Sequence, residues 1–161
     1  MFAGLILLQV VILNNINFLG YINPFFYVVF IFFYPFKKLD SAFLILSFLL
    51  GLSIDFFSNS GGINAAATLF AAYIRIPVVK AVLGKTELEF SGFSFRKLKF
   101  GKFLLIIVIL TFLHHFIIFS LEYFNLKNID LILLKTLLTG IFTIILILIS
   151  FIFFTNRHAS Y

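Results

Sequence analysis

The feature that constrains this chain most is the length of its stretches without charge. No Asp, Glu, Lys or Arg occurs in residues 1–36, 41–54, 56–74, 103–121 or 136–156. An apolar stretch of roughly 20 residues is what an α-helix needs to cross a hydrocarbon core about 30 Å thick. With 63% hydrophobic and only 11% charged residues, the chain also lacks the polar side chains that cover a water-soluble fold. We therefore expect an integral membrane protein of the all-α class.

Six apolar segments are separated by short polar stretches, and we interpret each segment as a membrane-spanning helix within one domain, residues 1–161. The segments run from Phe2 to Ile16, Pro24 to Phe36, Ser41 to Phe57, Ile63 to Leu83, Lys102 to Tyr123 and Ile129 to Phe154. The second is shorter than a bilayer requires, so neighbouring residues should contribute to it. Asp40 is a residue type that caps a helix start. Met1–Val11 lacks the basic flank and cleavage site of a signal peptide, which favours a retained first span.

The distribution of Lys and Arg predicts the orientation. With six spans, ten of the 12 basic residues fall on one side: Lys37, Lys38, Arg75, Lys80, Lys85, Arg96, Lys97, Lys99, Lys102 and Arg157. The other side carries Lys127 and Lys135. Because cytoplasmic loops carry the excess of Lys and Arg, both termini should lie in the cytoplasm. The stretch Gly84–Gly101 interleaves Phe with basic residues, which is compatible with contact to membrane lipid, with docking of a cytoplasmic partner or with a solvated loop. The net charge of +6 is therefore interpreted as topology, with no nucleic-acid partner.

Two stripes of mostly small residues are candidates for helix packing or for a partner interface. Ser47, Gly51 and Asp55 recur every four residues in the third segment. Ala67, Ala71 and Arg75 do the same in the fourth. Residues at this spacing share one helix face, and small ones let a neighbouring backbone approach closely. We expect both faces to pack inside the bundle, and they are candidates for packing against each other.

Asp55 and Arg75 carry opposite charges in neighbouring segments, but their depths differ. Arg75 lies about 12 residues into its segment, which is roughly 18 Å at helical rise, whereas Asp55 closes its own segment. We predict no ion pair between them. Arg75 should face the bundle interior or extend to the cytoplasmic headgroups. Asp55 should lie at the outer interface, beside the loop that contains Gly61 and Gly62.

His114 and His115 fall in the middle of the fifth segment, where ionisable groups are costly and are candidates for function. Adjacent residues point about 100° apart on a helix, so the two cannot share a metal ion as an i, i+4 pair would. His115 and Glu122 share a face, which is compatible with a polar track. A neutral histidine bonded to a neighbouring helix is the favoured interpretation.

The sequence contains no constellation typical of catalysis. It has no cysteine, no H-x-x-x-H pair, no Ser-Lys or Ser-His arrangement and no glycine-rich phosphate loop. We therefore predict no catalytic residue, no metal and no cofactor, and expect that the protein is not an enzyme.

Nearly the whole chain resembles the MreD family, a membrane subunit of the bacterial rod-shape machinery, and the central signature lies in the third and fourth segments. The resemblance lies in residues 48–57 (FLLGLSIDFF), 58–68 (SNSGGINAAAT) and 69–75 (LFAAYIR). It extends to residues 8–10, 14–16 and 20–24 and to the adjacent histidines. In that family an aspartate closes one span, a short Gly-containing loop follows, and a small-residue helix begins. Asp55, Gly61 and Gly62 match this pattern.

The resemblance implies a scaffold rather than a catalyst. Family members bind MreC and act with MreB and the wall-synthesis proteins of the elongation machinery, in support of peptidoglycan synthesis and cell shape. Their location is the bacterial inner membrane, and their six helices resemble the substrate-binding subunits of vitamin uptake transporters. Two alternatives stay open. His114, His115 and Arg75 suit a small-solute-binding subunit or transporter, and His115 with Glu122 or Asp55 could serve as the acid and base of an intramembrane enzyme.

Overall fold

The computed structural model describes residues 2–16, 23–36, 40–84, 93, 95, 98–124 and 126–156. Within these ranges every regular element is a helix. Four helices are long and apolar enough to cross a membrane, which makes the chain a helical multi-pass membrane protein. They are α3 (Ser41–Ser58), α4 (Ile63–Leu83), α5 (Phe100–Tyr123) and α6 (Ile129–Asn156).

The helix boundaries follow the sequence signals closely. The Asp40 carboxylate accepts a hydrogen bond from the backbone N–H of Phe43 at 3.1 Å, so the predicted cap of α3 is confirmed. Helix α5 begins at Phe100, two residues before the predicted start. Much of the stretch Gly84–Gly101 (residues 85–92, 94, 96 and 97) lies outside the described residues, as do Lys37, Lys38 and Arg157.

The first two predicted spans are shorter and less regular than the other four. The first comprises α1 (Phe2–Leu7), a wider π-helical turn (Leu8–Ile12) and a tighter 3-10 turn (Leu13–Asn15). The second is helical only from a 3-10 turn (Phe26–Val28) through α2 (Val29–Phe33).

Prolines explain the short second segment. Pro35 forces the residue before it out of the helical region, and Tyr34 is extended, with φ −69° and ψ 134°. Pro24 lacks the backbone N–H that would bond within a helix beginning four or more residues earlier in the chain. The eight helical residues rise only about 12 Å, which is less than a bilayer core.

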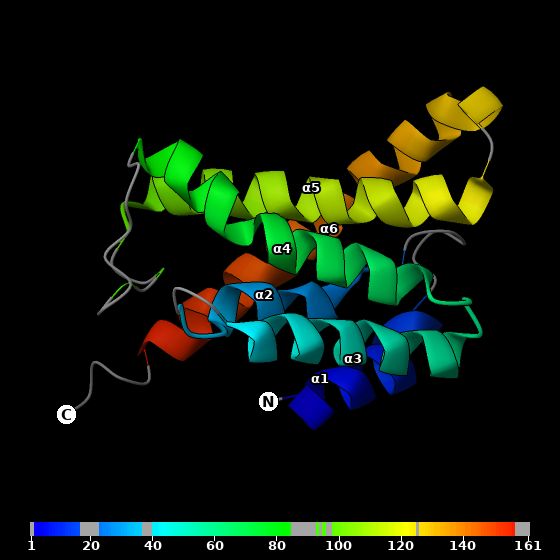
Figure 1. Ribbon diagram of the computed structural model, residues 1–161, viewed down its shortest axis with the longest axis horizontal. Coiled ribbons are helices and arrows are strands. Elements are labelled where there is room, and N and C mark those ends of the chain that lie inside the picture. The colour runs from blue at the N-terminus through cyan, green and yellow to red at the C-terminus, as the bar shows by residue number, and fades with distance from the viewer. Residues whose placement is uncertain are drawn as a thin grey trace.

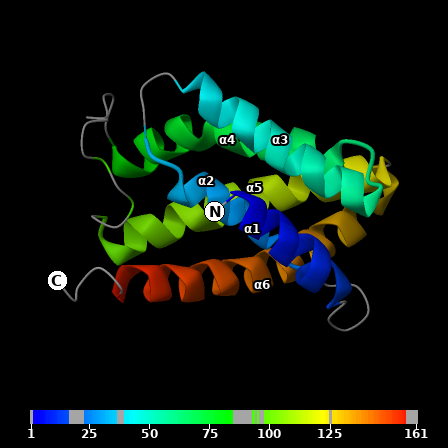
Figure 2. The same ribbon diagram turned by 90° about the horizontal axis from the view of Figure 1, so that it is seen from below.

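The long helices pack in chain order, with α3 against α4, α4 against α5 and α5 against α6 (Figure 1). Viewed from below, α2 lies in the middle of the bundle, with α3 and α4 on one side of it and α6 on the other (Figure 2). Tyr27 and Val28 of the preceding 3-10 turn and Val29–Phe32 of α2 are all buried. Because α2 is surrounded by protein, its irregular backbone can lie at membrane depth without contacting lipid.

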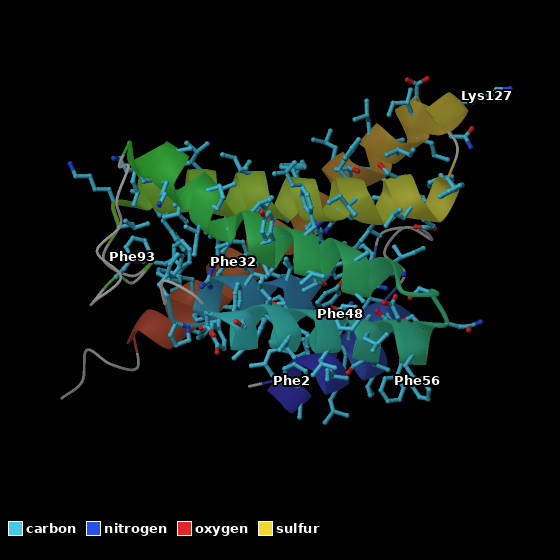
Figure 3. The ribbon with its side chains drawn as sticks, in the orientation of Figure 1. Phe2, Phe32, Phe48, Phe56, Phe93 and Lys127 are labelled. Atoms are coloured by element: carbon cyan, nitrogen blue, oxygen red, sulfur yellow. The ribbon has the colours of Figure 1, made fainter. Side chains whose placement is uncertain are left out.

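The outer surface of the long helices is apolar. Side chains such as Leu49, Phe56, Leu133 and Ile141 are exposed, and Phe56 points away from the bundle in Figure 3. An apolar exterior suits hydrocarbon as the surrounding solvent. The helices are therefore apolar on both their inward and outward faces.

Candidate functional site

The turn between α3 and α4 is organised by one buried carboxylate. Oδ1 of Asp55 accepts hydrogen bonds from the Ser60 hydroxyl at 2.6 Å and from both the backbone N–H and the side-chain amide of Asn64 at 2.9 Å. Oδ2 accepts from the backbone N–H of Ala65 at 2.8 Å. The first backbone N–H groups of a helix have no partner within the helix, so Asp55 caps α4 from the end of α3. It lies beside the glycine loop as predicted, but it is only 4% exposed.

Left-handed backbone conformations close this turn. Asn59 ends α3 with φ 53°, and Gly61 and Gly62 follow with φ 64° and 93°. Glycine adopts such conformations without steric cost, and Asn tolerates them better than most residues do. The two glycines of the family-like loop are therefore explained by backbone geometry, which brings the start of α4 within reach of Asp55.

Helices α3 and α4 touch backbone to backbone at Gly51. A Cβ atom on Gly51 would lie 2.5 Å from the carbonyl oxygen of Asn64 and 2.6 Å from Cα of Ala65. The face opposite Gly51 is thus formed by Asn64 and Ala65, so the two predicted stripes do not meet each other at this point. Ala67 instead packs with residues of α5 and α6, including Ile118 and Ile132.

The stripe residues lie inside the chain. Ser47 and Gly51 on α3, and Ala67, Ala71 and Arg75 on α4, are all buried. A partner would therefore meet other residues than these, and their role here is packing.

Arg75 caps the C-terminal end of α2 within the bundle. Its guanidinium donates to the backbone carbonyls of Ile31 at 2.7 Å, Tyr34 at 3.0 Å and Pro35 at 3.3 Å. The last carbonyls of a helix lack partners within the helix, and a cation is favourable at that end of the helix dipole. Arg75 therefore faces the interior, one of the two predicted positions, and it makes no ion pair with Asp55.

Two aromatic rings enclose the same guanidinium. The Cζ atom of Arg75 lies 3.9 Å from the ring centroids of both Phe36 and Phe43. A cation held over an aromatic face gains electrostatic stabilisation that increases when water is excluded. At 1% exposure, Arg75 is among the most buried side chains of the described residues.

The start of the second segment is held in a similar way by side chains from two other helices. Gln9 donates to the carbonyl of Pro24 at 2.9 Å and accepts from the backbone N–H of Tyr27 at 3.4 Å. The backbone N–H of Phe25 donates to the hydroxyl of Thr143 at 3.2 Å. Backbone groups in a membrane interior must find partners within the protein. Gln9, Thr143 and Arg75 therefore supply partners to backbone groups at both ends of the short helix.

His115 has a partner on each ring nitrogen. Nδ1 lies 2.8 Å from the carbonyl oxygen of Thr111, which can only accept, so Nδ1 carries the proton. Nε2 lies 3.0 Å from the Thr143 hydroxyl and accepts from it. This is the arrangement of a neutral imidazole bonded to its own and a neighbouring helix.

His114 belongs to a second polar group, centred on Asn64. Tyr27 donates its hydroxyl proton to Oδ1 of Asn64 at 2.7 Å, and Thr68 donates to the Asn64 backbone carbonyl at 2.6 Å. Nε2 of His114 lies 3.3 Å and 3.5 Å from these two hydroxyl oxygens. Nδ1 of His114 is buried without a hydrogen-bond partner among the described residues. A continuous set of bonds thus leads from Asp55 through Asn64 and Tyr27 to the centre of the bundle.

Glu122 does not join this group. Its side chain is 48% exposed and lies 3.9 Å from Nζ of Lys135, whereas His115 is fully buried. The polar track predicted from the seven-residue spacing of His115 and Glu122 is therefore not formed by contact between them.

Sequence reasoning missed Gln9, Tyr27, Asn64 and Thr143, which supply most of the partners of the predicted residues. Each of these is a polar side chain within an uncharged apolar stretch. In a membrane such a side chain needs a hydrogen-bond partner inside the protein, and this could have indicated their role. Within the described residues no group of three or more His, Cys, Asp or Glu could hold a metal ion. No protein-family model, curated protein or solved structure matches the chain.

Proposed function

We propose that this protein is a non-enzymatic scaffold subunit of the bacterial rod-shape and cell-wall elongation complex, located in the inner membrane. In this proposal it spans the membrane six times with both termini in the cytoplasm, in the manner of the substrate-binding subunits of vitamin uptake transporters. It binds MreC and, through it or directly, works with MreB and the wall-synthesis proteins. The proposal starts from the resemblance of residues 48–75 to the MreD family.

The observation that carries the proposal is that the two charged side chains of that stretch are bonded to backbone and side chains within the chain. Asp55 accepts four hydrogen bonds from the turn and from α4, and Arg75 donates to three carbonyls. A catalytic acid or base must be free to reach a substrate proton. Buried groups whose bonds join neighbouring helices serve instead to fix those helices relative to each other, which suits a rigid assembly subunit.

Co-purification tests this proposal. The tagged chain is expressed with the candidate MreC and the wall-synthesis subunits, extracted in a mild detergent and captured. We expect MreC in stoichiometric amount. Gly51→Leu should lose MreC because the new side chain would displace α4, whereas Gly101→Leu, with open space around its Cβ position, should retain it. Monodisperse wild-type protein without MreC would overturn the proposal.

A small-solute-binding subunit or transporter is the second candidate. The observation in its favour is the interrupted segment 23–36, whose buried Tyr27 places its hydroxyl oxygen 3.3 Å from Nε2 of the buried His114. Interrupted helices at mid-membrane depth form substrate sites in many transporters. A ligand that binds the folded state raises its thermal stability. Unchanged stability across a panel of vitamins and metabolites would remove this candidate.

A further inference from the structure

A polar pocket of about 460 Å³ opens at the end of the bundle where α3 ends, α4 begins and α5 ends, on the right in Figure 1. The N-terminal segment and residues 23–25 complete its wall. Its volume lies within the range of small-ligand sites, about 300–1,000 Å³. A second cavity of about 270 Å³ lies at the opposite end and is lined mainly by phenylalanine, including Phe93 and Phe95. Only the first combines such a volume with several polar side chains among the described residues.

Most of the amide donors on this wall are already used within the chain. Nδ2 of Asn14 donates to the Ser58 hydroxyl at 2.9 Å. Nδ2 of Asn15 donates to the carbonyls of Val10 at 3.3 Å and Val11 at 2.9 Å. Nδ2 of Asn64 donates to Asp55 and Ser60.

Acceptors remain available on the same wall. Within the described residues, Oδ1 of Asn15 receives no hydrogen bond. The carboxylate of Glu122 is half exposed, with Lys135 at 3.9 Å as its charged partner. The wall therefore offers hydrogen-bond acceptors to a ligand that brings the donors.

The lining of this pocket carries a negative charge, and the nearby Lys135 ammonium lies outside the lining, 3.9 Å from the Glu122 carboxylate. Glu122 is the charged residue of the lining, and the lining contains no Lys, Arg or His among the described residues. The Asp55 carboxylate lies directly behind the wall, bonded to Ser60 and Asn64. A pocket with carboxylates at and behind its wall attracts cations and disfavours phosphates and carboxylates.

We propose that this pocket binds an organic cation that carries a guanidinium or primary ammonium group. The cation would pair with Glu122 and donate to Oδ1 of Asn15. Phe25 and Phe57 also line the pocket, and aromatic side chains stabilise both a cation and the apolar part that carries it. The source is either a free cationic metabolite or an Arg or Lys side chain of a bound protein, since both present the same group.

Lys135 is the internal competitor for Glu122. The contact of 3.9 Å is long for an ion pair, and the Lys135 ammonium also lies 4.9 Å from the ring centroid of Tyr123 and 5.6 Å from that of Phe119. An exposed pair of this kind contributes little to stability. A bound cation can therefore take its place at the carboxylate.

Isothermal titration of the purified, detergent-solubilised chain with L-argininamide tests the proposal, with L-citrullinamide as the uncharged analogue. We expect saturable binding of argininamide alone. Glu122→Gln should weaken it about two- to fivefold, the effect of losing a charge contact at a half-exposed site. Lys135→Gln should strengthen it by removing the competitor. Asp130→Asn, which removes an exposed carboxylate at the same end of the molecule but outside the pocket, should leave it unchanged.

The opposite results would overturn the proposal. They are the absence of saturable argininamide binding to wild-type protein, equal binding of citrullinamide, or equal losses in Glu122→Gln and Asp130→Asn.

A competition experiment identifies whether the natural cation is a free metabolite or a side chain of a partner protein. If argininamide displaces a co-purified partner protein, the natural cation is a side chain of that partner. If argininamide binds the intact complex with unchanged affinity, the natural ligand is a free cation. Both outcomes can be obtained whether or not the chain binds MreC, so this proposal and the scaffold proposal can fail separately.

Discussion

At the scale of single residues, the buried side chains of Asp55 and Arg75 are each hydrogen-bonded to the end of a neighbouring helix. Asp55 receives donors from the start of α4, and Arg75 supplies donors to the end of α2. Each therefore sits at the helix terminus whose dipole favours its own charge. Burying such a group without partners would cost several kcal/mol, so each variant below tests a specific set of bonds.

Asp55→Asn should destabilise the fold by about 1–3 kcal/mol, because one acceptor oxygen becomes a donor that faces other donors. A lower midpoint of thermal unfolding in detergent checks this. Asp130→Asn is the matched control, because Asp130 is an exposed carboxylate in the first turn of α6 and surface substitutions usually change stability by less than about 0.5 kcal/mol. Equal effects of the two substitutions would contradict the central role given to Asp55.

Arg75→Lys should also destabilise the chain, by about 2 kcal/mol or more. Lys carries a single point charge and lacks the planar fork of donors that reaches three carbonyls and lies between two rings. Arg75→Met should cost still more, since it leaves those carbonyls unpaired. Lys80→Met, in the last turn of the same helix, serves as the control with a small expected effect. Thermal unfolding ranks the three variants.

At the scale of helices, α3 and α4 approach each other most closely at Gly51, where a Cβ atom would lie 2.5 Å from backbone of α4. This approach requires Gly51, because the atoms that face it belong to backbone that cannot rotate away. A Cβ atom on Gly140 of α6 would instead lie 2.9 Å from a ring carbon of the Phe112 side chain. Side chains can move and backbone cannot, so the two glycines should differ in their tolerance of a methyl group.

A graded series of Gly→Ala substitutions tests this difference. Gly51→Ala should destabilise by about 3 kcal/mol or more, and Gly140→Ala by roughly 1 kcal/mol. Gly101→Ala meets open space within α5 and should stabilise slightly, by up to about 1 kcal/mol, because Ala is the better helix former. Thermal midpoints of the three variants should follow this order, and a Gly51→Ala protein as stable as wild type would contradict the backbone contact.

The helices that span the membrane could be predicted from sequence, but their rotation about their own axes could not. Lipid tolerates apolar residues on every side, so a spanning helix lacks the polar face that marks the outside of a soluble one. The spacing of Ser47, Gly51 and Asp55 indicated the right face of α3. It could not show that Asn64 and Ala65, rather than Ala67, would lie against it. Likewise the partners of Arg75 are backbone carbonyls of a segment expected to be fully helical, and only its interruption at Pro35 frees them.

At the scale of the whole molecule, the bundle has two chemically different ends. One carries the α3–α4 turn and the polar pocket, and the other carries the Phe-lined cavity near the start of α5. The distribution of Lys and Arg predicts that the first end faces away from the cytoplasm. This orientation decides which solutes and partners can reach the pocket.

Single-cysteine labelling tests the orientation, and the natural chain contributes no background because it lacks cysteine. Lys127→Cys and Lys99→Cys place reporters at exposed positions beyond the two ends of α5. A membrane-impermeant maleimide should label Lys127→Cys in intact cells and Lys99→Cys only after permeabilisation. The reverse pattern would invert the predicted topology, and labelling of both in intact cells would exclude α5 as a span.

The position of Arg75 along the chain has a consequence for biogenesis. The three carbonyls that receive its donors and the two rings that enclose it belong to residues 31–43, all of which leave the ribosome before Arg75 does. A guanidinium entering the bilayer alone would be costly. Here the carbonyls and rings that surround the guanidinium have already been synthesised. Helix α4 can therefore enter the membrane with partners for its charge already present. The residues that stabilise the buried charge thus precede it in the order of synthesis.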